Sequence, residues 1–478
     1  MASILFLQPL RIHKRWPMPE DFTGLISSVP TLALAQLAGC LPGHRRELVD
    51  GIAREYTLRE LDASAARADL VLVNAHSSIG ALNVEANLRR IKERSPDKAV
   101  VLGGHHATLY DREWVARGAD YVVRHEGEDT IRELVAALAA GRGGEGIAGL
   151  TWRDASGAAR RNPDRELAAD LDRLPMPDWS LLEPKLYGLP LPGGGWATSV
   201  ETSRGCGHRC AFCAASDMWR HRQRYKSPER VLDELKLLRG LGYRKLWVVD
   251  DNFGGDPGIA AAICEGIIRA RLDLRWMCFL RADTASRHPE LIALAARAGL
   301  RHALVGFESP LAGKLREFGK GGDGADYGQA SAVLRRHGVF VGGFFIVGTH
   351  GETRRETAQV LAAAAELSDY PIVSIFEPRR GTEAFRRSTE QGDLPSADMF
   401  YHNTVHALPS LRAPLMRQYR AFYRNFLLAP RQLRQFAWGT PAQRSFYRFL
   451  FAGMARSLLS VTPAKLRQPW EMVLDIRD

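Results

Sequence analysis

The chain has 478 residues, of which 45% are hydrophobic and 25% are charged. This is the balance of a folded protein with two or three domains rather than a disordered or fibrous one. No stretch approaches the roughly 18 consecutive apolar residues that a membrane span needs. The apolar run near the N-terminus precedes its basic residues, which is the reverse of an export signal. Six cysteines are too few for a disulfide scaffold, so we expect a cytoplasmic protein with reduced thiols.

The net charge of +11 is concentrated at the C-terminal end. Between Val405 and Asp478, twelve lysines and arginines stand against three acidic residues, and aromatic residues alternate with the arginines. Three interpretations compete: a helical cap with a solvated basic face, a helix that contacts a membrane surface, and a nucleic-acid-binding segment. The cap is favoured and nucleic acid is the least favoured.

Residues 1–150 alternate between short apolar runs and helical patterns. The predicted strands are Ser3–Leu7, Leu70–Asn74 and Lys98–Leu102, and the predicted helices include Val84–Arg94 and Glu128–Ala140. This alternation predicts an α/β domain with a parallel sheet and helices on both faces, Rossmann-like or flavodoxin-like. Ligands of such folds bind at the carboxyl ends of the strands, which here carry Gln8 and the loops 76–80 and 103–108.

Residues 151–197 are rich in proline and glycine and predict a linker. The βα alternation resumes over residues 198–400. The predicted strands there are Thr198–Thr202, Lys245–Val249, Arg275–Leu280, His302–Phe307, Val339–Val347 and Ile372–Phe376. About six βα units predict a partial TIM-like barrel, whose chemistry lies at the carboxyl ends of its strands. Residues 401–478 predict a basic helical extension.

Three cysteines, Cys206, Cys210 and Cys213, follow the first predicted barrel strand with C-x3-C-x2-C spacing. Thiolates hold iron–sulfur clusters, and three of them leave one iron of a cubane open to another ligand. The alternative, a structural zinc site, closes its shell with four Cys or His ligands. Cys264 and Cys278 lie inside a predicted helix and a predicted strand, not beside this loop. The cluster is therefore the favoured interpretation.

This motif resembles that of the radical S-adenosylmethionine (SAM) enzymes, in which three cysteines hold a [4Fe–4S] cluster and an aromatic residue, here Phe212, precedes the third. The resemblance covers about residues 198–378 and implies SAM contacts at the ends of the later strands. The residues it indicates for SAM are Phe212, Asp250, Asp251, Arg281, Glu308, Ser309 and Ile346. Segment 377–382 departs from the family's Pro-Gly-Thr turn through its two arginines.

Residues 1–180 resemble the cobalamin-binding domain of B12-dependent radical SAM enzymes, through segments 100–108, 118–128 and 174–178. The cobalamin contacts that this implies are Gln8, Ser77, Ser78, Gly103, Gly104, His105, Thr108 and Glu126. We expect the two glycines to let the backbone approach a corrin, because a Cβ there would collide. Since Asp-x-His-x-x-Gly is absent, we expect no histidine ligand to cobalt and interpret His105 and His106 as loop or corrin-edge groups.

The resemblance implies a C-methyltransferase that acts on an unactivated carbon of a small-molecule natural product or lipid. A deoxyadenosyl radical would take hydrogen from the substrate, and cobalamin would supply the methyl group. The alternatives are a ring cyclase or oxidoreductase of the anaerobic tetrapyrrole type and a tRNA-modifying radical SAM enzyme. The methylthiotransferases of the latter group need a second cluster, and only Cys40 precedes the barrel.

A non-catalytic cobalamin or SAM sensor is disfavoured, because a sensor has no need of a reducible cluster. The expected partners are a small-molecule substrate, such as a lipid or a tetrapyrrole, and an external electron donor of the flavodoxin or ferredoxin type. We do not expect nucleic acid as a partner. The C-terminal region is a candidate for peripheral membrane contact.

Overall fold

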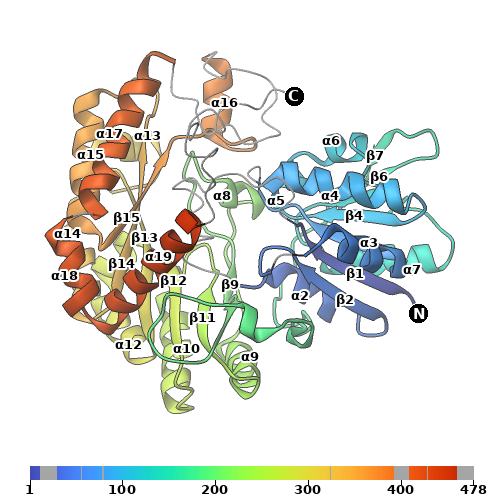
Figure 1. The fold of residues 1–478 in the computed structure, drawn as a ribbon, viewed down its shortest axis with the longest axis horizontal. Coiled ribbons are helices and arrows are strands. Elements are labelled where there is room, and N and C mark those ends of the chain that lie inside the picture. The colour runs from blue at the N-terminus through green and yellow to red at the C-terminus, as the bar shows by residue number, and fades with distance from the viewer. Residues whose placement is uncertain are drawn as a thin grey trace. The chain divides into compact units, whose positions relative to one another are not determined.

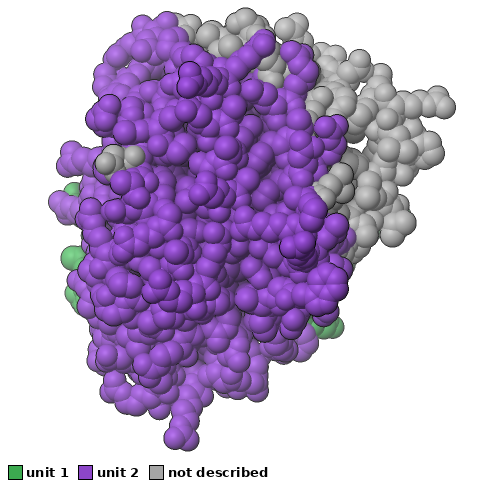
Figure 2. Space-filling view, turned by 90° about the vertical axis from the view of Figure 1, so that its left-hand side faces the viewer, with its two compact units in different colours: residues 1–14, 30–186, 396–403 green, residues 15–29, 187–395, 404–478 purple. Residues whose placement is uncertain are grey.

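The computed structural model describes residues 1–10, 29–54, 56–77, 80–322, 324–391, 409–427 and 429–459. The chain divides into two compact units, shown in green and purple in Figure 2. Unit 1 comprises residues 1–14, 30–186 and 396–403, and unit 2 comprises residues 15–29, 187–395 and 404–478. Each unit is built around its own sheet.

The sheet of unit 1 has the strand order β2-β1-β3-β4-β5-β6-β7. Its strands are β1 (Ser3–Gln8), β2 (Arg45–Asp50), β3 (Leu70–Asn74), β4 (Ala99–Gly103), β5 (Tyr121–Val123), β6 (Leu150–Arg153) and β7 (Ala159–Arg161). The first five are parallel, and β6 and β7 add antiparallel. The order of the parallel strands is that of flavodoxin-like folds, which confirms the predicted class. Sequence reasoning missed β2, whose RRELVD has only two apolar residues.

The helices of unit 1 are α2 (Leu32–Gly39), α3 (Leu58–Arg67), α4 (Ala81–Arg94), α5 (His105–Leu109), α6 (Asp111–Ala116) and α7 (Glu128–Ala139), followed by the 3-10 turns η3 (Trp179–Leu181) and η4 (Pro184–Leu186). The core forms where Phe6, Leu72 and Val101 of the sheet meet Ile131 and Leu134 of α7. The hairpin β6–β7 lies partly within residues 151–197, where the sequence predicts a linker, and it extends this sheet instead.

The sheet of unit 2 has six parallel strands in the order β15-β14-β13-β12-β11-β8 (Figure 1). Its strands are β8 (Trp196–Val200), β11 (Tyr243–Val248), β12 (Arg275–Arg281), β13 (Leu300–Glu308), β14 (Phe340–Val347) and β15 (Tyr370–Ile375), and β9 (Ser203–Arg204) pairs with β10 (Arg224–Tyr225) in a separate hairpin. An open sheet of six strands in sequence order is a half-barrel, as predicted.

One face of this sheet packs against helices. The helices are α8 (Ala214–Met218), α9 (Pro228–Gly240), α10 (Pro257–Arg269), α11 (Ala282–Arg287), α12 (Pro289–Arg297), α13 (Ala312–Glu317), α14 (Tyr327–Arg336), α15 (Arg354–Leu367) and α16 (Glu383–Glu390). Leu246 and Val248 of β11 lie against apolar residues of α9 and α10. The alternating residue Trp247 therefore belongs to the opposite, inner face of the half-barrel.

Three helices follow at the C-terminal end: α17 (Pro409–Leu427), α18 (Pro430–Trp438) and α19 (Pro441–Leu459). The hydroxyl of Tyr419 donates to the Val373 carbonyl (3.0 Å), and the Val373 N–H donates to the Tyr423 hydroxyl (2.9 Å). Helix α17 thus satisfies polar groups of the edge strand β15 that would otherwise lack a neighbouring strand. Among the described residues, no helix is long and apolar enough to cross a membrane.

His302 of β13 is buried on the inner face, between Phe340 (ring centroids 4.8 Å apart) and Phe446 of α19 (5.6 Å). Neither ring nitrogen has a hydrogen-bond partner among the described residues. Burial lowers the pKa of His302 to about 3. The folded protein therefore keeps this ring neutral, whereas the unfolded chain protonates it below about pH 6.5.

We expect wild-type stability to fall as the pH drops below about 6.5, with His302 contributing about 1.4 kcal/mol per pH unit. The variant His302→Leu removes this contribution, so its stability should depend less steeply on pH. Urea unfolding of both proteins between about pH 7 and pH 5 measures the difference in slope. Parallel curves for the two proteins would show that His302 is not the group that titrates.

Candidate active site

The three cysteines of the motif lie on the loop between β9 and α8, beyond the carboxyl end of β8. The middle of this loop is fixed from both sides: the Ala211 N–H donates to the Phe318 carbonyl (2.7 Å), and the Ala384 N–H donates to the Ala211 carbonyl (2.8 Å). The Phe212 ring packs edge-on against Phe318, with centroids 5.2 Å apart. These contacts hold in place the backbone that carries Cys206, Cys210 and Cys213.

The entry to the loop requires a glycine. Gly205 has a φ of +87°, and a Cβ there would lie 2.1 Å from the Arg222 carbonyl oxygen. Any side chain would push the backbone away from this carbonyl and displace Cys206, the next residue.

The donor set of the loop fits a cluster. Burial raises the pKa of both the Cys206 and the Cys210 thiol, while Arg281 acts on both in the opposite direction, as Lys320 does on Cys210. Among the described residues, no three Cys, His, Asp or Glu side chains converge on a single metal ion. A cubane cluster binds each thiolate through a different iron, so spaced thiols beside two cations suit it better than they suit one zinc ion.

Ion pairs and a hydrogen bond link the two cations, Arg281 and Lys320, to each other and to the predicted SAM residue Glu308. Arg281 pairs with Asp283 (2.9 Å) and also donates to the Lys320 carbonyl (3.0 Å). The Lys320 ammonium forms a buried ion pair with Glu308 (2.8 Å), whose φ of +65° is unusual for a residue other than glycine. Sequence reasoning missed Lys320; its position in the glycine-rich run 319–322 is the signal that could have found it.

Asp250 and Asp251, predicted to bind SAM, both bind the cysteine loop or the chain that leads into it. The buried Asp250 carboxylate accepts from the Thr202 N–H (2.6 Å) and the Ser203 hydroxyl (2.8 Å). The Asp251 carboxyl accepts from the Gly205 N–H and from Trp219. This geometry favours a positioning role for both carboxyls. Trp219 was not anticipated from the sequence.

The inner face of the half-barrel is lined by aromatic rings. Trp247 lies 5.7 Å from Phe279, and Phe279 lies 6.1 Å from Phe344, between ring centroids. All three side chains are only partly buried, as is Ile346, which is also on β14. Ser309 is buried at the end of β13, and its hydroxyl accepts from the Leu311 N–H (3.2 Å). The wall next to the predicted SAM residues is therefore apolar.

In unit 1, the predicted cobalamin residues lie at the carboxyl ends of β1, β3, β4 and β5. The Gln8 side-chain oxygen accepts from Asn74 (2.7 Å) and from Thr31 (2.8 Å), which joins the ends of β1 and β3 at the point where the strand order reverses. Flavodoxin-like folds bind their ligands at this point. Ser77 follows β3 and is partly buried. Ser78, also predicted to contact cobalamin, lies outside the described residues.

The two glycines differ in what they do. A Cβ on Gly103 would meet no atom nearer than 3.8 Å, whereas a Cβ on Gly104 (φ +109°) would lie 2.8 Å from the Ala75 carbonyl oxygen. Gly104 is thus required by its own chain, so its glycine does not need a corrin to explain it. The open surface at Gly103 fits a broad, flat ligand.

Of the two neighbouring histidines, His105 begins α5 and is partly buried. His106 is fully buried, stacks on Tyr110, and accepts at Nδ1 from the Trp114 indole (3.0 Å). This position in the core does not suit a cobalt ligand, and it differs from the loop or corrin-edge position that we expected for His106.

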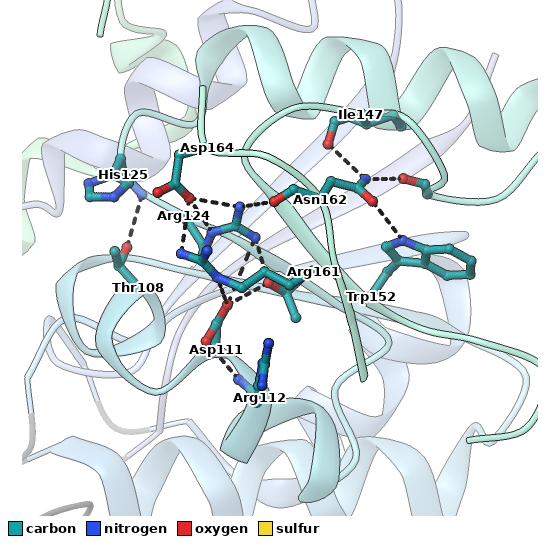
Figure 3. Close-up of polar contacts among 12 residues, drawn as sticks. Thr108, Asp111, Arg112, Arg124, His125, Ile147, Trp152, Arg161, Asn162 and Asp164 are labelled. Atoms are coloured by element: carbon teal, nitrogen blue, oxygen red, sulfur yellow. Dashed lines mark hydrogen bonds and ion pairs between the residues drawn. The ribbon is translucent and has the colours of Figure 1, made fainter. Parts of the chain in front are cut away.

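Behind this edge lies a buried polar network centred on Arg124, which directly follows β5 (Figure 3). The Arg124 guanidinium is fully buried, pairs with Asp164 (2.9 Å), and donates to Thr151 and to the Asn162 carbonyl (2.6 Å). Burial raises the pKa of Asp164, but the hydrogen bond and the charge of Arg124, together with the charges of Arg161 and His125, hold that pKa below its ordinary value. The network was not anticipated from the sequence.

The Arg124 network adjoins the predicted cobalamin residues. The next residue, His125, has a φ of +57°, and its N–H donates to the Thr108 hydroxyl (2.9 Å), which itself donates to the Gly104 carbonyl (3.0 Å). The Glu126 carboxylate accepts from the Ala168 N–H (2.6 Å). Thr108 and Glu126 therefore hold neighbouring chain segments together at this edge.

Comparison with known proteins assigns a family to both units. The model of the B12 binding domain matches residues 27–135, and the model of the radical SAM superfamily matches residues 200–364. An uncharacterized methyltransferase of Pyrococcus horikoshii is 30% identical over 419 residues, which cover 84% of this chain and 89% of that protein. The chain belongs to the cobalamin-binding radical SAM enzymes. This confirms the predicted cofactors: a [4Fe–4S] cluster, SAM and cobalamin.

Two further relatives of this radical SAM enzyme differ in activity. The hopanoid C-3 methylase of Methylococcus capsulatus is 26% identical over 84% of this chain and 77% of its own length. The anaerobic magnesium-protoporphyrin IX monomethyl ester cyclase of Rubrivivax gelatinosus is 26% identical over 72% of this chain and 63% of its own length.

A solved structure confirms the fold. TsrM, a radical SAM methyltransferase from Kitasatospora setae, superposes with a TM-score of 0.67 at 20% identity, over 83% of this chain and 80% of its own.

Proposed function

We propose that this radical SAM enzyme transfers a methyl group to an unactivated carbon of an apolar small molecule or lipid. The observation that carries the substrate class is the inner face of the half-barrel, where Trp247, Phe279 and Phe344 form a partly exposed aromatic wall. Aromatic walls bind apolar ligands by burying their surface. The hopanoid methylase among the relatives supports the same class.

The proposed roles follow from the contacts. When the cofactors are bound, the cluster supplies the electron that cleaves SAM, and cobalamin carries the methyl group. Cys206, Cys210 and Cys213 hold the cluster. The Asp250 and Asp251 carboxyls fix the loop that carries these cysteines. They act as positioning residues, whereas the sequence analysis assigned them to SAM.

Around the loop, the proposed SAM residues are Phe212, Arg281, Glu308, Ser309 and Ile346. Two ion pairs, Lys320–Glu308 and Arg281–Asp283, fix the positions of these charged side chains. In unit 1, we propose Gln8, Ser77, Gly103 and His105 for cobalamin. Thr108 and Glu126 support that edge through their contacts with His125 and Ala168.

The proposal is tested on protein reconstituted anaerobically with iron, sulfide and hydroxocobalamin, which should retain about four irons and one corrin per chain. The loaded enzyme is incubated with reduced flavodoxin, methyl-labelled SAM and an extract of apolar small molecules. We expect 5′-deoxyadenosine and a product heavier by one labelled methyl group, a net gain of roughly 14 Da for the unlabelled group. A product without the label, formed by loss of hydrogen or gain of oxygen, would favour the cyclase alternative instead.

A further inference from the structure

A strip of exposed apolar side chains lies on α18 and continues to α19. Leu433, Phe436 and Trp438 of α18 are 52%, 37% and 81% exposed. The Phe436 ring meets Phe451 of α19 edge-on, with centroids 5.3 Å apart. Phe451 is itself partly buried and packs against the core of unit 2. The exposed Leu433, Phe436 and Trp438 and the partly buried Phe451 are called the α18–α19 strip below. Clustered apolar side chains on a surface mark an interaction site more often than scattered ones do.

The opposite side of α18 is fixed to the body of unit 2. Gln432 is buried, the Arg431 guanidinium donates to the Ala365 carbonyl (3.0 Å), and the Gln435 amide donates to Asp369 (3.4 Å). Helix α18 is therefore docked through Arg431, Gln432 and Gln435. Leu433 lies on the opposite side of the helix, and the exposed Phe436 and Trp438 lie on its two flanks. Helix α18 lies on the side of unit 2 that faces the viewer in Figure 2.

The charged residues of the segment that carries the strip are all basic. Residues 409–459 contain nine arginines and no Asp or Glu. Arg434 is four residues before Trp438, so the two are neighbours on the helix surface. Arg434 and Arg448 are both exposed, and neither forms an ion pair with another residue in the described part of the chain.

We propose that the α18–α19 strip docks on the surface of an anionic lipid bilayer. Leu, Phe and Trp side chains enter the boundary between headgroups and acyl chains, and arginines beside them pair with anionic headgroups. A second copy of this chain would bring arginines against arginines. A nucleic acid would satisfy the arginines but leave Leu433 and Phe436 without apolar surroundings. The proposal is independent of the reaction proposed above.

The test uses the full chain, reconstituted with its cofactors, and sedimentation with sucrose-loaded vesicles. Phosphatidylcholine vesicles are compared with vesicles that also contain phosphatidylglycerol. We expect binding to the anionic vesicles that weakens with salt. The double variants Leu433→Ser/Trp438→Ser and Arg434→Glu/Arg448→Glu should each lower the partition coefficient at least about ten-fold. The controls Leu237→Ser and Arg297→Glu replace exposed residues of α9 and α12 and should bind as wild type does.

Iron content and melting temperature, equal in all variants, show that the changes are confined to the surface. The proposal is overturned if wild type does not sediment with anionic vesicles, or if the double variants sediment as well as it does. It is also overturned if light scattering shows a wild-type dimer that Leu433→Ser/Trp438→Ser converts to a monomer. Binding to RNA or DNA in place of vesicles would likewise overturn it.

Discussion

The variant Cys210→Ala is expected to lower the iron content of the reconstituted protein from about four atoms per chain to below about one. Two thiolates are too few to hold a cubane, because two irons would lack a protein ligand. SAM cleavage should fall to background. The fold should persist, since the loop backbone is held by Phe318 and Ala384 through Ala211. Iron analysis, absorbance of the cluster and 5′-deoxyadenosine formation measure these effects.

The matched control is Cys264→Ala. Cys264 lies in α10, is fully buried, and belongs to the same unit, but it is not part of the loop. Removing one sulfur from this core should cost about 1 kcal/mol of stability and leave iron loading unchanged. Bound corrin should also be unchanged in Cys210→Ala, because the B12-binding match ends at residue 135. A Cys210→Ala protein that still held a full complement of iron would contradict the assignment of this cysteine.

The variant Arg124→Met is expected to destabilise the protein by about 1–3 kcal/mol, the usual cost of leaving buried acceptors without their donor. Without the guanidinium, the Asp164 carboxylate keeps only its ion pair with Arg161 (3.0 Å), and the Asn162 carbonyl loses a donor (Figure 3). The N–H of the next residue, His125, donates to the Thr108 hydroxyl. We therefore also expect the predicted cobalamin site of unit 1 to bind hydroxocobalamin more weakly. Urea unfolding and titration with hydroxocobalamin measure the two effects.

Arg112 provides the control for Arg124, because it is drawn in the same view but is exposed. Arg112→Met should change stability by no more than about 0.5 kcal/mol and should bind hydroxocobalamin as wild type does. Arg124→Lys keeps the charge but loses the planar fork of donors, so we expect an intermediate loss. Equal unfolding curves for Arg124→Met and wild type would refute the role of this network.

Much of the fold followed from local patterns. β1, β3 and β4, and all six strands of the half-barrel, overlap the predicted runs, because buried parallel strands are continuous apolar segments bounded by turns. Gly299 and Gly338 have φ values of +109° and +72° directly after α12 and α14, as expected for glycines that follow the end of a helix. The cysteine spacing, three thiols within eight residues, is likewise a local pattern.

Local sequence patterns do not predict the contacts around the sites. Lys320 pairs with Glu308, and Arg124 with Asp164; the partners in each pair are separated in sequence and come together only when loops meet. The carboxylates of Asp250 and Asp251 are acceptors that could serve a ligand or the protein itself. Only the tertiary structure shows that Thr202, Ser203 and Gly205 occupy them.

The sequence by itself determined the two α/β units and the loop that carries the three thiols, because each rests on periodicity or spacing within a short segment. The family followed from the resemblance of its motifs to those of known enzymes. Tertiary structure alone decided which polar residues support the site, through distant carboxylates and cations. It also decided which apolar residues remain outside the core. Phe446 and Trp438 lie eight residues apart in the sequence, yet one is buried on the half-barrel and the other is 81% exposed. Both are large aromatic residues, so residue type does not distinguish them. The packing of the helices against the sheet does.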